Sequence, residues 1–87
     1  MLIEKGMIVK SVAGHDQNRF YVVISADGIN ARIADGKVRP LEKPKSKKVK
    51  HLAATTARVD AEAITTNRQL RQVLAAYNNG RREENIE

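Results

Sequence analysis

The sequence contains no cysteine, which excludes disulfide bonds, thiolate metal ligands and a cysteine nucleophile from its chemistry. It is also poor in aromatic residues, which make up 3% of its 87 positions. These residues are Phe20, Tyr21 and Tyr77. Domains that recognise unpaired bases, such as RNA-recognition motifs and OB-folds, stack them on exposed rings. The shortage of aromatic rings therefore argues against that way of binding nucleic acid.

Long apolar runs are absent as well. The longest, residues 20–24, is far too short to cross a bilayer. The first nine residues, MLIEKGMIV, include a glutamate and lack the apolar length of a signal peptide. A chain of 87 residues corresponds to one small domain. We expect a soluble cytoplasmic protein that makes no contact with a membrane.

The residue patterns of an enzyme are missing. The serines lack a nucleophile motif, and there is no glycine-rich loop to hold a phosphate. Asp27 and Asp35 each precede a glycine and are better explained as turn residues than as paired catalytic acids. The only histidines, His15 and His51, have neither a cysteine nor a paired acid at helix spacing to complete a metal site. We therefore predict a protein that is not an enzyme and has no cofactor, metal or small-molecule substrate.

The positive charge is concentrated in one segment. The net charge is +6, yet residues 1–36 hold four cations and four acids, and residues 52–87 hold five of each. The remaining segment, residues 37–51, has seven lysines or arginines and one glutamate, and we call it the basic strip. Such a strip is typical of a surface that contacts a polyanion. The alternative is a solvated loop that only keeps the protein soluble.

Local signals predict strands over most of the first half of the chain. Strand-like sequence occupies residues 7–12 and 19–26, and the second of these is apolar enough to be buried on both faces. Asp-Gly pairs at 27–28 and 35–36 are each flanked by strand-like sequence and favour two-residue hairpin turns. Residues 19–41 are therefore predicted to form a three-stranded antiparallel meander, with its strands at 19–26, 29–34 and 37–41.

The segment after this meander is predicted to be an exposed connection followed by a closing strand. Pro44 prevents a helix across the lysines, so residues 42–47 are interpreted as exposed chain. Residues 49–55 suit a closing strand, whereas residues 56–64 are ambiguous between strand and loop.

Residues 66–79 are predicted to form an amphipathic helix. Thr66 and Gln69 have the spacing of a capping box, and Gly80 can end the helix. The apolar face consists of Leu70, Val73, Leu74 and Tyr77. The sequence thus predicts a small closed or nearly closed β-barrel over residues 1–64, a helix packed on it over 65–80, and a disordered tail over 81–87.

Two stretches resemble a known family. Residues 6–24, GMIVKSVAGHDQNRFYVVI, resemble the KOW motif. Residues 35–52, DGKVRPLEKPKSKKVKHL, resemble the second signature of a KOW subgroup. That subgroup contains eukaryotic and archaeal large-subunit ribosomal proteins and small stand-alone bacterial relatives. The resemblance covers roughly residues 1–79 and implies an SH3-like barrel that binds ribosomal RNA, as a ribosomal component or a ribosome-associated factor that is monomeric when free.

The resemblance also implies which residues contact RNA. The loop glycine of the family corresponds to Gly14, and its charged loop residues correspond to Asp16 and Arg19. The basic signature corresponds to Lys37, Arg39, Lys43, Lys45, Lys47, Lys48, Lys50 and His51. Where the family commonly has a second loop glycine, this chain has Asn18, the residue next most tolerant of positive φ. We expect the five lysines from Lys43 to Lys50 to neutralise phosphates, with Pro40 and Pro44 holding the strip extended.

Other partners are compatible with the same sequence. SH3-like barrels also bind proteins, and such a site would show as an exposed apolar patch away from the lysines. Double-stranded DNA is a third candidate that charge alone does not exclude. Lysines bind phosphates as point charges, so the basic strip predicts affinity more than sequence specificity.

Overall fold

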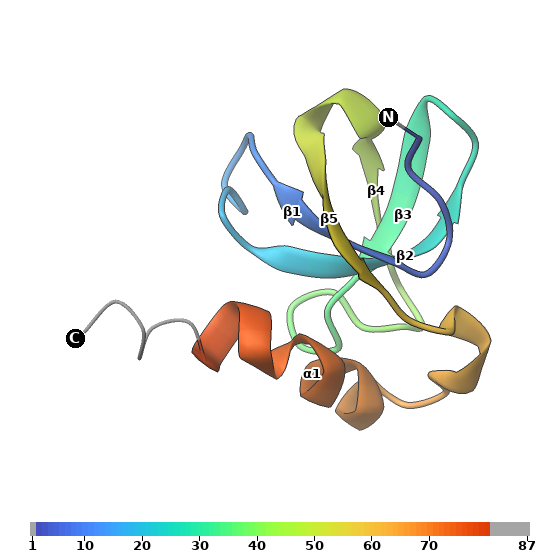
Figure 1. The fold of residues 1–87 in the computed structure, drawn as a ribbon, viewed down its shortest axis with the longest axis vertical. Helices are drawn as coiled ribbons and strands as arrows, with labels where there is room; N and C mark the ends of the chain where they lie inside the picture. Colours follow the sequence, from blue (N-terminus) through green and yellow to red (C-terminus); the bar gives the residue numbers. More distant parts are fainter. Residues whose placement is uncertain (1, 81–87) are drawn as a thin grey trace.

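Five antiparallel strands and one C-terminal helix make up the computed structural model, which describes residues 2–80 (Figure 1). The strands form one sheet in the order β4-β3-β2-β1-β5. They are β1 (Met7–Ser11), β2 (Phe20–Ala26), β3 (Asn30–Ala34), β4 (Lys45–Lys48) and β5 (Leu52–Arg58). A 3₁₀ turn at Val49–His51 joins β4 to β5, which crosses back to pair with β1. The protein is mainly β, and this arrangement is consistent with a small SH3-like barrel.

Strand β2 is buried on both faces, as its apolar sequence predicts. Successive side chains of a strand point to opposite faces, so Tyr21 and Val23 face one way and Phe20 and Val22 the other. The cluster inside the barrel contains Ile3, Val9, Tyr21, Val23, Ala31, Ile33 and Leu52. The second cluster, between sheet and helix, contains Ile8, Phe20, Val22, Ala34, Leu70 and Leu74. The helix is therefore needed to keep water from the outer face of β2.

Helix α1 spans Asn67–Ala75 and is followed by a wider helical turn over Ala76–Gly80. It lies along one end of the barrel (Figure 1). The predicted apolar face is confirmed: Leu70 and Leu74 are buried, and Val73 and Tyr77 pack against the second cluster. The predicted capping box is also confirmed, because the Thr66 hydroxyl accepts from the backbone N–H of Gln69 at 3.1 Å while the Gln69 side chain accepts from that of Thr66. The tail predicted for residues 81–87 lies outside the described residues.

The first Asp-Gly pair forms the predicted turn between β2 and β3. The Asp27 carboxylate accepts from the backbone N–H groups of Ile29 at 3.0 Å and Asn30 at 2.8 Å. Gly28 has a φ of 94°, a conformation that glycine adopts without strain.

The second Asp-Gly pair does not form the predicted two-residue turn, and the strand predicted for residues 37–41 is wrong. The Asp35 carboxylate accepts from the backbone N–H groups of Lys37 and Arg39, both at 2.9 Å, and so curls the chain into a loop. The chain turns again where the N–H of Lys43 donates to the carbonyl of Pro40 at 3.0 Å. The chain is therefore not extended up to Lys43, whereas residues 45–48, which follow Pro44, are extended as expected.

The third strand of the meander comes from the basic strip itself. Residues 45–48 form β4, which pairs with β3 so that Lys48 lies opposite Asn30 and Lys45 opposite Ile33. The prediction of an exposed connection over residues 42–47 is therefore wrong from Lys45 onward. The closing strand begins at Leu52, later than predicted, and continues to Arg58.

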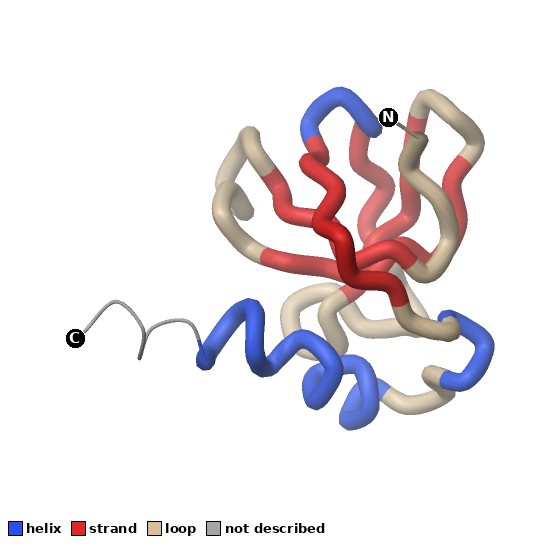
Figure 2. The backbone as a smooth tube through the Cα atoms, in the orientation of Figure 1, coloured by secondary structure: helices blue, strands red, loops and turns tan. Residues whose placement is uncertain are grey.

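The loop between β3 and β4 is attached to the helix. The Asn67 side chain accepts from the backbone N–H of Leu41 at 2.8 Å, and Arg71 donates to the carbonyl of Gly36 at 2.8 Å. Gly36 has a φ of 80°, and a β-carbon there would lie 2.5 Å from the carbonyl oxygen of Asn67. Figure 2 shows this loop in tan beside the helix in blue. Basic residues of the loop are thereby held next to α1.

Replacing Thr66 with alanine should destabilise the protein by about 1 kcal/mol, because the first turn of α1 loses its cap. Urea unfolding of the wild type and Thr66→Ala measures this difference. Gln72→Ala, at an exposed position inside the same helix, is the control and should leave stability unchanged or slightly raised. Equal stability of Thr66→Ala and the wild type would show that the cap does not hold the helix.

Candidate nucleic-acid interface

Two of the five lysines in the middle of the basic strip are bound to one carboxylate. Asp16, in the loop between β1 and β2, accepts from Nζ of Lys47 at 2.7 Å and from Nζ of Lys45 at 3.0 Å. Ser11 donates to the same carboxylate at 2.8 Å, and Lys47 also donates to the carbonyl of Ala13 at 2.8 Å. The Lys47 side chain is only 8% exposed. The prediction that residues 42–47 are exposed is therefore wrong for Lys47 and, in part, for Lys45.

The alternation of β4 explains why these two lysines differ from their neighbours. Side chains two apart in a strand share a face, so Lys45 and Lys47 both meet the β1–β2 loop. Ser46 and Lys48 are exposed on the other face. The register of β4 against β3 thus decides which lysines are anchored to the barrel and which remain free.

The hydrogen-bond donors around Asp16 stabilise its ionised carboxylate. Burial alone would raise the pKa of this carboxyl group, but hydrogen bonds from Lys47, Ser11 and Lys45 outweigh burial and place the pKa well below its ordinary value. Asp16 is therefore an anion throughout the physiological range. Its position makes it an anchor for two lysines rather than a direct contact for a phosphate.

The β1–β2 loop takes the shape that its glycine and asparagine allow. Gly14 has a φ of 88° and Asn18 a φ of 74°. Asn18 thus fills, with positive φ, the place where the KOW family commonly has a second glycine. A β-carbon at Gly14 would lie 3.3 Å from Nζ of Lys47, so a side chain there would crowd the anchored ammonium group. The turn role of Gly14 is confirmed, and its contact with RNA stays a prediction.

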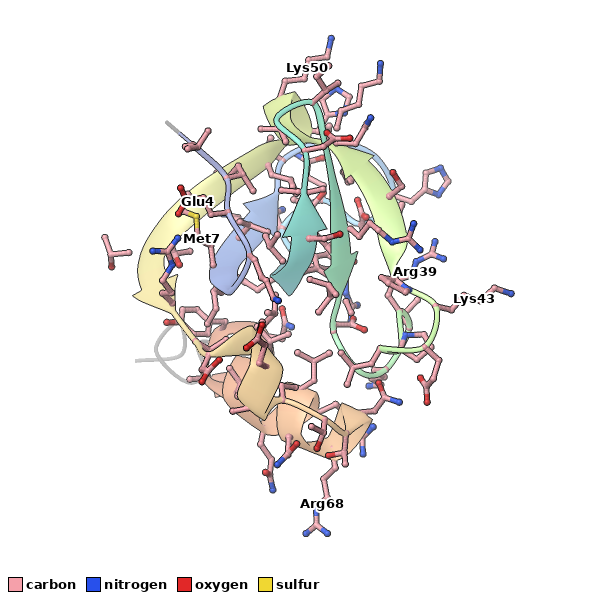
Figure 3. All side chains as sticks on the ribbon, turned by 90° about the vertical axis from the view of Figure 1, so that its right-hand side faces the viewer. Glu4, Met7, Arg39, Lys43, Lys50 and Arg68 are labelled. Carbon is pink, nitrogen blue, oxygen red and sulfur yellow. The ribbon has the colours of Figure 1, made fainter. Side chains whose placement is uncertain are left out.

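The exposed cations of the basic strip come from the loop before β4, from β4 itself and from the 3₁₀ turn after it. Lys37, Lys43, Lys48 and Lys50 are exposed, whereas Arg39 and His51 are half-buried. In Figure 3, Lys50 projects from one end of the barrel, while Arg39 and Lys43 lie along one side. The carbonyl of His51 accepts from the backbone N–H of Val12 at 2.9 Å, which ties the 3₁₀ turn to the β1–β2 loop.

Cations from distant parts of the chain meet in a hollow of about 230 Å³ beside β4. Its lining is His15, Asp16, Arg19, Tyr21, Val38, Arg39 and Lys45. Arg19 also pairs with the buried Asp35, whose Oδ2 lies 3.5 Å from its guanidinium. The structure therefore brings Arg19, Arg39 and Lys45 together around one hollow, and their contact with RNA stays a prediction.

Two of the exposed apolar side chains, Val38 and Ile29, lie among these cations, whereas Leu2, 64% exposed, lines a separate hollow with Glu4, Met7 and Arg58. Val38, 59% exposed, lines the hollow that contains Arg39 and Lys45. Ile29, 70% exposed, lines a second hollow with Lys48 and Lys50. A protein-binding site separate from the basic surface would need an apolar patch away from the lysines; Val38 and Ile29 do not supply one, and Leu2 is the exposed apolar side chain in its own hollow.

Sequence reasoning missed Arg71. This helix residue reaches the β3–β4 loop, and it lines a cleft with Arg19 and Lys37. The sequence does show that Arg71 directly follows Leu70, at the edge of the apolar stripe, which indicates a position close to the barrel. The loop that it contacts was predicted as a strand, so its neighbours were not foreseeable.

Within residues 2–80 there is no group of three or more histidine, cysteine, aspartate or glutamate residues that could hold a metal ion. None of the helices in this range is long and apolar enough to cross a membrane. No protein-family model matches the chain, and no curated protein matches its sequence. The likeness to the KOW family therefore remains a hypothesis that rests on the residues of the two stretches themselves.

Replacing Asp16 with asparagine should cost on the order of 2 kcal/mol at neutral pH, because Lys47 is left as a poorly solvated charge without its anion. Chemical denaturation measures the loss. The double variant Asp16→Asn/Lys47→Met removes both charges and should recover part of it. A double variant as unstable as Asp16→Asn would contradict the anchoring role.

The stability of the wild type and that of Asp16→Asn should also respond differently to pH. The pKa of Asp16 is lower in the folded chain than the ordinary value of 3.8, so its contribution is complete above that value and is lost as the pH falls toward the folded pKa. The stability difference between wild type and Asp16→Asn should shrink as the pH falls below about 4. A difference that stays constant from pH 7 to pH 2 would show that Asp16 gains nothing from its donors.

Proposed function

We propose that the protein is a non-enzymatic RNA-binding protein, and that folded ribosomal RNA is its target. The observation that supports this proposal is the segregation of charge: all six net positive charges belong to residues 37–51. That segment contributes the edge strand β4 and its flanking turns, where most of its cations are exposed. A concentrated field of this kind attracts a phosphate backbone and releases its counterions.

The character of the surface favours contact with the backbone over contact with bases. Phe20 and Tyr21 are buried, and Tyr77 packs against the ring of Phe20 with 5.3 Å between ring centroids. These rings are therefore not free to stack bases. Lysine recognises a phosphate as a compact charge without reading sequence. Such a surface suits the shape and backbone of folded RNA.

The contribution of each cation follows from its partners. Lys43, Lys48 and Lys50 are exposed and supply the mobile charge that neutralises phosphates. Lys45 is 30% exposed and lies at the edge of the hollow, so it can contact a phosphate while still bound to Asp16. Lys47 donates to Asp16 and to the carbonyl of Ala13, so it supports the loop that contains Gly14.

The same argument supports an association with the ribosome. The likeness to the KOW family and the SH3-like arrangement support a ribosomal protein or a ribosome-associated factor in the cytoplasm. Ribosomal RNA presents the dense, folded phosphate backbone that this surface suits.

A variant with Lys43, Lys48 and Lys50 all changed to glutamine tests the proposal. Three fewer phosphate contacts should make the slope of log K against log salt shallower by about two to three units. Fluorescence anisotropy with a structured ribosomal RNA fragment, measured across a salt series, gives both slopes. The barrel should stay folded because these side chains are solvated.

The matched control changes Lys5, Lys10 and Arg68 to glutamine, which lowers the net charge equally outside the basic strip. Its slope should stay close to that of the wild type. If both triple variants change the slope equally, binding depends on overall charge and not on this surface. If the wild type binds no RNA, or binds with an affinity that salt does not change, the proposal is wrong and the protein-interaction alternative gains support.

A further inference from the structure

A cleft lies between the barrel and the helix, at a distance along the chain from β4, and Lys37 is the residue of the basic strip that lines it. Its volume is about 440 Å³, within the range of sites for small ligands. Its lining is Arg19, Asp35, Lys37, Arg71, Leu74 and Asn78. Three separate parts of the chain thus supply its walls: the end of the β1–β2 loop, the β3–β4 loop and α1 with the turn that follows it.

The lining carries an excess of positive charge. Arg19, Lys37 and Arg71 contribute three cations, and Asp35 contributes the single carboxylate. One oxygen of Asp35 is fully used, since it accepts the backbone N–H groups of Lys37 and Arg39. The other oxygen is buried and accepts no hydrogen bond, and its partner is the ion pair with Arg19 at 3.5 Å. The ion pair with Asp35 therefore holds the guanidinium of Arg19 at the cleft, which both residues line.

Arg71 is positioned in a similar way but retains free donors. One nitrogen of its guanidinium donates to the carbonyl of Gly36 at 2.8 Å. A guanidinium has five N–H groups in a planar fork, so several remain for a ligand. The Arg71 side chain is exposed, and Arg19 is 44% exposed, so solvent reaches both.

The remaining lining residues shape the cleft rather than recognise a ligand. Leu74 is buried and forms an apolar wall. The Asn78 side chain is occupied by the backbone of Phe20, since it accepts from the N–H at 2.9 Å and donates to the carbonyl at 3.1 Å. The polar groups that can receive a ligand are therefore the three cations.

We propose that this cleft binds a phosphate group between Arg19 and Arg71, with Lys37 as a third cation. Arginine forks match the oxygens of a phosphate and hold it more firmly than mobile lysines do. One repulsive group, the Asp35 carboxylate, also lines the cleft, but it is buried and paired with Arg19. The source of the phosphate is the backbone of the bound RNA, a step that rests on the proposed function, and it extends the RNA contact from β4 to the helix.

The experiment compares Arg71→Gln with Arg68→Gln. Glutamine at position 71 keeps a donor for the carbonyl of Gly36 and removes the charge. Arg68 lies on the same helix and points away from the barrel (Figure 3), so Arg68→Gln makes the same change in net charge outside the cleft. Arg71→Gln should weaken binding of the structured RNA several-fold and make the salt slope shallower by about 0.7–0.9. Arg68→Gln should do neither.

A third variant, Arg71→Lys, retains the charge and loses the fork. It should keep the salt slope of the wild type while binding less tightly, and it remains informative if Arg71→Gln folds poorly. Thermal melting of all variants provides the check on folding.

A second measurement distinguishes RNA phosphate from free phosphate. Inorganic phosphate is titrated against chloride at constant ionic strength while the side-chain N–H signals of Arg19 and Arg71 are followed by NMR. Shifts in these signals, together with weaker RNA binding by Arg71→Gln, support the RNA backbone as the source. Shifts without any effect on RNA binding support the same site with free phosphate as its ligand.

The proposal is overturned if inorganic phosphate moves neither arginine signal and Arg71→Gln binds RNA as the wild type does. This failure is distinct from a failure of the proposed function. In the first case RNA binding persists and still responds to loss of Lys43, Lys48 and Lys50. In the second case the wild type itself shows no salt-dependent RNA binding.

Discussion

The burial of β2 on both faces is the constraint on which the rest of the structure depends. A strand with apolar side chains at successive positions needs cover on each side. The barrel covers Tyr21 and Val23, but Phe20 and Val22 face outward and require a second layer. Helix α1 supplies that layer with Leu70 and Leu74. With the helix in that position, its residues Asn67 and Arg71 contact the β3–β4 loop. The cleft between barrel and helix is a result of this arrangement.

The basic surface depends on a second constraint, the cost of placing like charges together. Lysines on successive positions of a strand repel one another unless an anion or solvent intervenes. The chain combines both solutions, because Asp16 holds Lys45 and Lys47 while Lys48 faces solvent. The anchored pair attaches the basic strip to the barrel, and under the proposed function the exposed lysines keep their charge for RNA. In that proposal, stability and binding use alternate side chains of the same strand.

Local signals were sufficient to predict the elements whose causes are local. The turn at Asp27 and Gly28, the cap at Thr66 and the apolar stripe of α1 each depend on residues within a few positions of one another. The double burial of β2 was readable from its composition. These features placed the helix and four of the five strands approximately where the structure has them, and they gave the correct fold class.

The errors arose where distant contacts decide the conformation. Asp35 and Gly36 have the sequence of a hairpin turn, but Asp35 instead binds the backbone of the residues that follow it, and Asn67 and Arg71 hold the resulting loop. The lysine-rich β4 contradicts strand propensity, yet it is an edge strand, where lysines are common because they discourage pairing with other chains.

The cations of the candidate site are visible in the sequence, but their different roles could not be predicted from it. Lys47 and Lys48 are adjacent and chemically identical. Only the pairing of Lys48 with Asn30 determines that Lys47 turns toward Asp16. Arg71 was missed because its significance comes from the loop opposite it.

The central claim is that this basic surface binds folded ribosomal RNA in the cell. Ultraviolet crosslinking in living cells, followed by sequencing of the RNA attached to the protein, tests it most directly. The account predicts that ribosomal RNA is enriched, with crosslinks concentrated at a few sites, and that the variant lacking Lys43, Lys48 and Lys50 loses this enrichment. Recovery of no RNA above background, or equal recovery with the variant, would contradict it.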